Sequence, residues 1–282
     1  MLAKKHTRTT LITALSLSVL GFAGATYAIH SWGNYHWART ANPFTLKTVD
    51  SVTSNWDAYL DESINDWSLS SVLDLAKEPG STSTRDRRLC RPVSGKIRAC
   101  NYTYGNNGWL GIAQIWVNSA GHITQATTKV NDTYFNTATY NTPAWRRMVM
   151  CQEIAHDFGL DHQDETFDNA NLGSCMDYTN DPDGGAGGAS ATDPSNEHPN
   201  AHDYEQIELI YAHLDSSTTI AQNKSGKVFA AIQNNDKKNQ DEREHPEFGR
   251  PEKRDAQGRV SRYVKEDRER GEKLYTFIIW AE

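Results

Sequence analysis

Apolar and polar residues follow two periods in the first half of the chain, and each period predicts a kind of element. Residues 44–49 alternate strictly, which is typical of a strand with one buried face. A helical spacing follows, with apolar residues at Val52, Trp56, Leu60, Ile64 and Trp67. Residues 110–117 form a short apolar run, and residues 122–130 alternate again after Gly121. These two segments predict strands joined by a tight turn.

Two further helices are predicted in the second half of the chain. Thr142 suits the N-cap and Pro143 the first position of a helix that runs to about residue 158. Gly159 then supplies the stop, because glycine tolerates the left-handed conformation that ends helices. Residues 181–200 are rich in Gly, Asp and Pro and predict a loop. An amphipathic helix is expected after it, over residues 203–214.

The composition changes after residue 216. Residues 234–270 are dense in charged side chains, which indicates a linker or a solvated extension. Residues 274–280 form an apolar, strand-like run, and we expect it to dock on the main domain because a lone strand is unstable in water. The chain is therefore divided into a signal segment (1–28), one folded domain (29–216) and a charged extension ending in a strand (217–282).

The chain begins like an export signal. Basic residues precede an apolar stretch over residues 11–25, and Ala25 or Ala28 can mark the cleavage site. The stretch is shorter than the roughly 20 residues of a membrane span, so a secreted, extracellular protein is expected, with an uncleaved anchor as the alternative. The net charge of -7 disfavours nucleic acid and stable membrane association. The sequence does not indicate an oligomeric state.

Four cysteines follow the signal segment, and an even number in an exported chain suggests two disulfides. Cys90 and Cys100 flank a short loop, which suits a local bridge and leaves Cys151 to pair with Cys175. Three connectivities are possible in principle.

The segment from Cys151 to His162 carries the candidate chemistry. Gln152 and His156 are four residues apart on a predicted helix, so they share a face, and Glu153 lies beside them. After the turn at Gly159, His162 returns towards the same point. Three ligands would then converge and leave a fourth position open, which is typical of a catalytic zinc site.

This segment resembles the signature of the metzincin zinc peptidases, H-E-x-x-H-x-x-G-x-x-H with a Met-turn. Four motif positions match, and the Met-turn matches as Ser-Cys-Met-Asp-Tyr over residues 174–178. The resemblance covers residues 42–216 and is strongest to matrixin-like secreted bacterial and fungal proteins. It implies an α+β fold, with a twisted mixed sheet, an active-site helix and a C-terminal helix. It also implies a bound Zn2+, Met176 beneath the metal and Tyr178 stabilising the transition state.

The first ligand of the family motif is histidine, and this chain has Gln152 there. An amide oxygen is a poorer zinc donor than imidazole. Gln152 can therefore bind zinc directly, hold a bridging water, or leave the site too weak to fill. Since the other motif residues are all present, we favour a working, altered site.

The resemblance implies a metalloendopeptidase that acts on protein or peptide substrates, with Glu153 as general base. The strand over residues 110–117 is the expected place for an extended substrate to pair. The first alternative is an inactive binding protein with the same fold, and the second is a hydrolase of non-peptide amides.

Several residues near the motif have two interpretations. His198 or His202 can replace the missing histidine, or they can be ordinary loop and helix-start residues. The acidic residues after the motif can support the ligands, bind Ca2+ together with loop 181–193, or be solvated; they are Asp161, Asp164, Glu165 and Asp168. His122 is interpreted as a surface residue of its strand.

Overall fold

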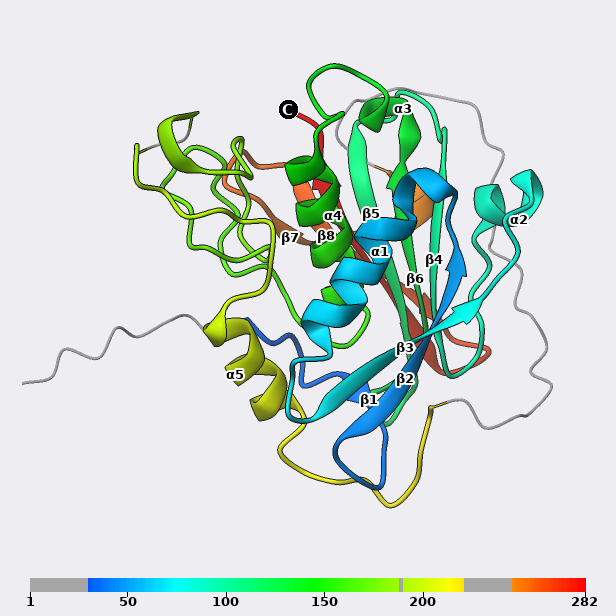
Figure 1. The fold of residues 1–282 in the computed structure, drawn as a ribbon. Coiled ribbons are helices and arrows are strands. Elements are labelled where there is room, and N and C mark those ends of the chain that lie inside the picture. The colour runs from blue at the N-terminus through cyan, green and yellow to red at the C-terminus, as the bar shows by residue number, and fades with distance from the viewer. Residues whose placement is uncertain (1–29, 188–189, 221–244) are drawn as a thin grey trace, which may run out of the picture.

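The computed structural model describes residues 30–187, 190–220 and 245–282 (Figure 1). Their helices are α1 (Ser54–Trp67), α2 (Thr84–Leu89), α3 (Asp132–Phe135), α4 (Pro143–His156) and α5 (Ala201–Ile210), with single 3-10 turns at Gly185–Gly187 and Pro246–Phe248. Their strands are β1 (His36–Trp37), β2 (Phe44–Ser51), β3 (Leu73–Pro79), β4 (Ile97–Tyr102), β5 (Trp109–Val117), β6 (His122–Asn131), β7 (Arg250–Arg254), β8 (Val260–Asp267) and β9 (Glu272–Trp280).

One mixed sheet of nine strands organises the described residues. Its order is β3-β2-β4-β6-β5-β9-β8-β7, with β1 added beside β6. The strands from β3 to β6 run parallel, and the pairs from β6 through β5, β9 and β8 to β7 are antiparallel. The structure thus combines helices with one mixed sheet, which confirms the coarse fold class that the sequence predicts.

Helices α1 and α4 lie together across one face of this sheet (Figure 1). Helix α1 buries the predicted stripe of Trp56, Leu60, Ile64 and Trp67. Helix α4 starts as predicted, with the Thr142 hydroxyl accepting from the Trp145 N–H at 3.3 Å and a proline at its start. Nearly all of α4 is buried, because the sheet, α1 and the loops after the helix surround it.

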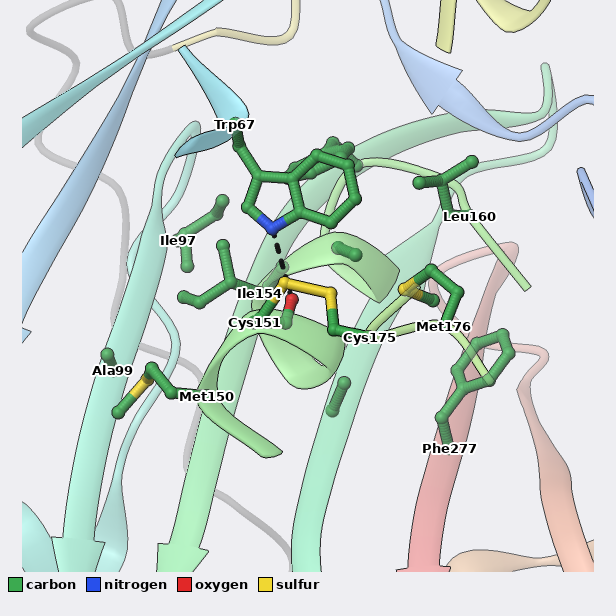
Figure 2. Close-up of a cluster of buried hydrophobic side chains, with 14 of the residues drawn as sticks. Trp67, Ile97, Ala99, Met150, Cys151, Ile154, Leu160, Cys175, Met176 and Phe277 are labelled. Carbon is green, nitrogen blue, oxygen red and sulfur yellow. Dashed lines mark hydrogen bonds between the residues drawn. A yellow bond between two sulfur atoms is a disulfide. The ribbon is translucent and has the colours of Figure 1, made fainter. Parts of the chain in front are cut away.

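Both predicted disulfides are present. Cys90 pairs with Cys100, and Cys151 pairs with Cys175. The second bridge ties α4 to the turn that carries Met176, and the Trp67 indole donates to the Cys151 carbonyl at 3.1 Å above it (Figure 2). Helix α4 and the Met176 turn are thus fixed to each other covalently and by packing in one core cluster.

The structure corrects the expectation of a charged linker over residues 250–267. Strands β7 and β8 lie there, and β8 buries Val260, Tyr263 and Val264, while its Arg262 pairs with Asp161. The many charged residues of this segment predicted a linker, although strands near a sheet edge also carry charged side chains at exposed positions. The strands β3 and β4 were not expected either, and the helix expected at 203–214 spans 201–210 instead.

The predicted docking of the last strand is confirmed, since β9 pairs with β5 along its whole length. The signal segment and residues 221–244 lie outside the described residues. Within the described ranges, no helix has the length and apolar character needed to cross a membrane.

Replacing Gly159 should destabilise the fold more than replacing a comparable glycine elsewhere. Gly159 has φ +110°, and an added Cβ would lie 2.5 Å from the Tyr35 carbonyl oxygen. We expect Gly159→Ala to lower the free energy of unfolding by about 3 kcal/mol, from backbone strain plus overpacking. Gly258 has φ +84° with nothing within 4 Å of the added Cβ, so Gly258→Ala should cost only about 1 kcal/mol. Urea unfolding measures both, and equal losses would contradict the clash.

Candidate metal centre

The end of α4 and the turn that follows bring two histidines together. The helix ends at His156, and the Leu160 N–H donates back to the Ala155 carbonyl at 3.3 Å across Gly159. The chain then reverses, so that His162 Nε2 lies 2.9 Å from His156 Nε2. Both side chains are buried. The predicted convergence of these two residues is therefore present.

The Nδ1 atom of each ring has an acceptor as its partner, so in each ring Nδ1 carries a hydrogen. His156 Nδ1 lies 2.7 Å from the Leu160 carbonyl oxygen, which can only accept, so this nitrogen donates. His162 Nδ1 lies 2.5 Å from a Glu165 oxygen and donates to it. In the neutral rings, both Nε2 atoms therefore present lone pairs to each other. Burial lowers the pKa of His156 well below its ordinary value, with His162 adding to the effect, so this ring is neutral.

Two facing lone pairs are the arrangement that a cation needs. Ligands about 2.0–2.1 Å from a tetrahedral zinc lie about 3.3 Å apart, close to the observed separation. Gln152 lies one helical turn before His156, is fully buried, and has no hydrogen-bond partner at either side-chain atom. Such orphaned polar atoms are costly in a dry core. The two imidazole nitrogens, with the unpartnered Gln152 amide one turn earlier on the same helix, are residues that could hold a divalent metal.

Glu153 lies beside these residues and against β5. An added Cβ at Gly111 would lie 2.5 Å from a Glu153 carboxylate oxygen, so only glycine leaves room for this side chain. Both carboxylate oxygens are buried without a partner. Burial raises the pKa of Glu153 well above its ordinary value, and Asp157 adds to the effect. The carboxyl group is thus available to exchange a proton with a molecule placed next to it.

Two carboxylates close to His162 in sequence, and two cations from the C-terminal strands, surround the His162 ring. Lys253 on β7 lies 3.2 Å from both Glu165 and Asp161, and Arg262 on β8 lies 2.8 Å from Asp161. Burial alone would raise the pKa of Asp161, but Arg262 and Lys253 outweigh it and lower the value to about 2. Burial alone would raise the pKa of Glu165 as well, but its contacts with His162 and Lys253 outweigh burial and lower the pKa. Asp161 and Glu165 thus make the contacts of the supporting interpretation, whereas the sequence favours a solvated loop for most of these acidic residues.

The predicted Met-turn runs alongside the segment that carries His162. The Gln163 N–H donates to the Met176 carbonyl at 2.6 Å, and the Tyr178 N–H donates to the Asp164 carbonyl at 3.1 Å. Met176 is fully buried in the same cluster as the Cys151–Cys175 bridge (Figure 2). The Tyr178 hydroxyl oxygen lies 3.3 Å from His162 Nε2.

Strand β9 covers the centre. The Phe277 ring stacks on the His156 ring with centroids 4.2 Å apart and planes at 15°. The Tyr178 hydroxyl donates its proton to the Ile278 carbonyl at 2.9 Å. The expectation that β5 offers a free edge to a substrate is wrong for this state, because β9 already pairs with β5 antiparallel. Sequence gave no signal that Phe277 and Ile278 would reach the motif.

The two proposed substitutes for the missing histidine have other contacts. His198 Nδ1 lies 2.7 Å from an Asp66 oxygen on the surface, and the His202 ring packs against His30 with centroids 4.9 Å apart. In comparisons with known proteins, no family model matches the chain and no curated protein matches it. The function is therefore inferred from the site itself.

Asp177 in the Met-turn predicts a pH dependence of stability. Burial raises its pKa to about 7, although the Leu172 N–H and the Asn196 amide donate to it. The folded protein therefore holds a proton that the unfolded chain releases above its ordinary value of 3.8. The contribution of Asp177 to the free energy of unfolding should be complete below pH 4. It should be lost as the pH rises to about 7, and the total loss is on the order of 4 kcal/mol.

Urea unfolding at pH 5 and pH 8 measures this effect. Asp177→Asn should remove most of the difference between the two pH values, whereas Asp74→Asn at an exposed carboxylate should retain it. An unchanged difference in the Asp177→Asn protein would show that another group is responsible.

Proposed function

We propose that the chain is a zinc-dependent endopeptidase of the metzincin type, held latent by its own C-terminal strand. The observation that carries the proposal is the convergence of two imidazole nitrogens, 2.9 Å apart, beside the buried and unpartnered Gln152 and Glu153. The order of motif residues, the turn at Gly159 and the Met176 turn beside His162 all support the same interpretation.

Each residue has a role that its position allows. His156, His162 and the Gln152 amide oxygen would hold the ion, which when bound would act as a Lewis acid and acidify water. Glu153 would take a proton from that water and pass it to the leaving nitrogen, since a raised pKa suits a group that both accepts and returns a proton. The Tyr178 hydroxyl would donate to the developing oxyanion once it is released from Ile278.

Strand β9 has the geometry expected of a substrate. It adds to β5 antiparallel, with Ala113 opposite Phe277 and Ile112 opposite Ile278, which is how an extended peptide augments a sheet edge. Its Phe277 side chain lies on a ligand histidine and its Ile278 carbonyl accepts from Tyr178. Cleavage of another peptide therefore requires β9 to leave this position, and the intact chain should cleave slowly.

A second candidate function has its own support. Residues Tyr275 to Trp280 of β9 are all buried, and burying each large apolar side chain is worth about 1.5–3 kcal/mol. A strand held this strongly fits a metal-stabilised binding protein without catalysis. The two functions share the metal and differ in the fate of β9.

Zinc content and cleavage test the centre. We expect His162→Gln to lose one equivalent of zinc relative to the wild type, because it removes a ligand. Gln152→His should bind this zinc at least about 10-fold more tightly, since imidazole is the better donor. Glu153→Gln should keep the zinc and lose cleavage of casein by at least about 100-fold. Glu205→Gln, at an exposed carboxylate of α5, is the matched control.

Zinc bound equally by the wild type and His162→Gln would refute the metal centre. Full cleavage by Glu153→Gln would refute the assigned general base, whatever the zinc content.

Two changes test whether β9 blocks cleavage: a disulfide that holds it on β5, and a substitution that weakens its packing over His156. Gln114 and Thr276 are cross-strand partners with side chains 3.3 Å apart, so a Gln114→Cys, Thr276→Cys protein should form a disulfide that holds β9 on β5. Casein cleavage by the oxidised protein should fall to background. Phe277→Ala removes the ring that stacks on His156 and should increase cleavage at least about 10-fold, because the covered state loses its packing.

The double Gln114→Ser, Thr276→Ser protein controls for the loss of the native side chains. Equal cleavage by the locked and unlocked proteins would contradict the role of β9. Zinc binding without cleavage in the Phe277→Ala protein would favour the second candidate.

A further inference from the structure

A second cluster of metal-binding side chains lies where β1 pairs with the start of β6. His36 belongs to β1 and His122 begins β6, where the two residues are register partners in a parallel pair. His213 and Asp215 come from the segment that follows α5. The cluster shares no residue with the centre at the end of α4, so an inference drawn from it goes beyond the proposed function.

His36, His122 and Asp215 offer one ligand atom each, all within 4.8 Å of one another, and His213 lies at one side of this group, near His36 and Asp215. The Asp215 Oδ1 atom lies 3.4 Å from His36 Nε2, 3.3 Å from His122 Nε2 and 3.8 Å from His213 Nε2. His213 Nε2 lies 3.2 Å from His36 Nε2. Ligand atoms about 2.0–2.2 Å from a tetrahedral zinc would lie about 3.3–3.5 Å apart. The observed separations bracket this value.

The contacts around the cluster leave the inner atoms for a cation. His36 Nδ1 lies 2.7 Å from the Asn34 carbonyl oxygen and donates to it, so in the neutral ring Nε2 carries the lone pair. The other Asp215 oxygen, Oδ2, accepts from the Arg39 backbone N–H at 3.1 Å and from Arg39 Nη1 at 3.0 Å. Oδ1 therefore faces the histidines while Oδ2 is fixed from behind, as is usual for a metal-bound carboxylate.

Ion pairs alone explain this arrangement poorly. Charging His36 alone would let its two nitrogens donate to Asn34 and to Asp215, but His122 Nε2 and His213 Nε2 would still lie beside the same carboxylate oxygen. Keeping the histidines neutral would leave the His36 lone pair facing a carboxylate oxygen at 3.4 Å. A divalent ion removes both conflicts, and three imidazoles with one carboxylate are a donor set that suits zinc.

We propose that His36, His122 and Asp215 bind a structural transition-metal ion of the zinc class, and that the exposed His213 turns in to complete its coordination shell. Four protein ligands close the coordination shell, which is the mark of a structural site. The side chains of His36 and Asp215 are nearly buried, at 8% and 10% exposure, whereas that of His213 is 53% exposed. His213 is therefore the ligand through which the ion enters. The ion joins β1, the start of β6 and the chain after α5.

Metal titration of the full exported protein tests this site, with Zn2+ and Co2+ as the probes after removal of bound metal by a chelator. The His162→Gln protein is the background, so that the centre at the end of α4 does not contribute. In this background we expect one equivalent of Zn2+, a higher melting temperature when it binds, and visible absorption from tetrahedral Co2+. Adding His122→Gln or His213→Gln should weaken binding at least about 100-fold and abolish the temperature shift.

His198→Gln is the matched control, because this histidine pairs with Asp66 on the surface outside the cluster. His213→Gln also guards against a folding defect, since its exposed side chain is the least needed for packing. Circular dichroism checks that each protein is folded. No Zn2+ bound in the His162→Gln background, or the same affinity in its His213→Gln derivative, would overturn the proposal. Either result leaves the peptidase proposal untouched, because that depends on the zinc lost with His162.

Discussion

Two imidazole lone pairs that face each other in a dry core are the constraint on which the centre depends. The outer nitrogens of His156 and His162 contact the Leu160 carbonyl and the Glu165 carboxylate, and the side chains of Gln152 and Glu153, on the same helix as His156, are buried without hydrogen bonds. Leaving such groups unsatisfied costs on the order of 1–3 kcal/mol each, whereas a metal ion satisfies them together. Binding of a metal ion would therefore be coupled to folding at this centre. On the proposed function, the same coupling would let the Gln152 amide take the place of a stronger ligand, since enclosure would add to the affinity that an amide lacks.

The strands after residue 245 both close the centre and support it. Strand β9 supplies the ring that covers His156, while Lys253 on β7 and Arg262 on β8 hold the carboxylates around His162. Because these strands are hydrogen bonded to one another, moving β9 would also strain the ion pairs that orient His162. Closure and preorganisation of the site are thus properties of one sheet extension, and a change that opens the site should also loosen its ligands.

Local signals predicted what local chain geometry determines. The cap at Thr142, the stop at Gly159 and the short spacing from Gln152 to His162 lie within one helix and turn, so the convergence of ligands could be inferred from spacing alone. Strands β3, β4, β7 and β8 were missed because no simple alternation marks most of them: β3 alternates only briefly, β4 is buried along most of its length, and β7 and β8 are rich in charged residues. The contact between Phe277 and His156 depends on which strand pairs with β5, and no local pattern encodes that choice.

The two candidate metal sites also differ in how far apart their residues lie in the sequence, and the segment before β1 contacts both of them. One is built within a short segment, whereas His36 and Asp215 are 179 residues apart in sequence. Next to His36, the Trp37 indole donates to the Asp157 carbonyl at 2.8 Å, one residue after His156, and the preceding Tyr35 carbonyl abuts Gly159. The segment that the second cluster fastens to the sheet therefore braces the turn that brings His162 back. A bound ion at Asp215 would restrict this brace, so the geometry of the first centre rests partly on side chains outside its motif.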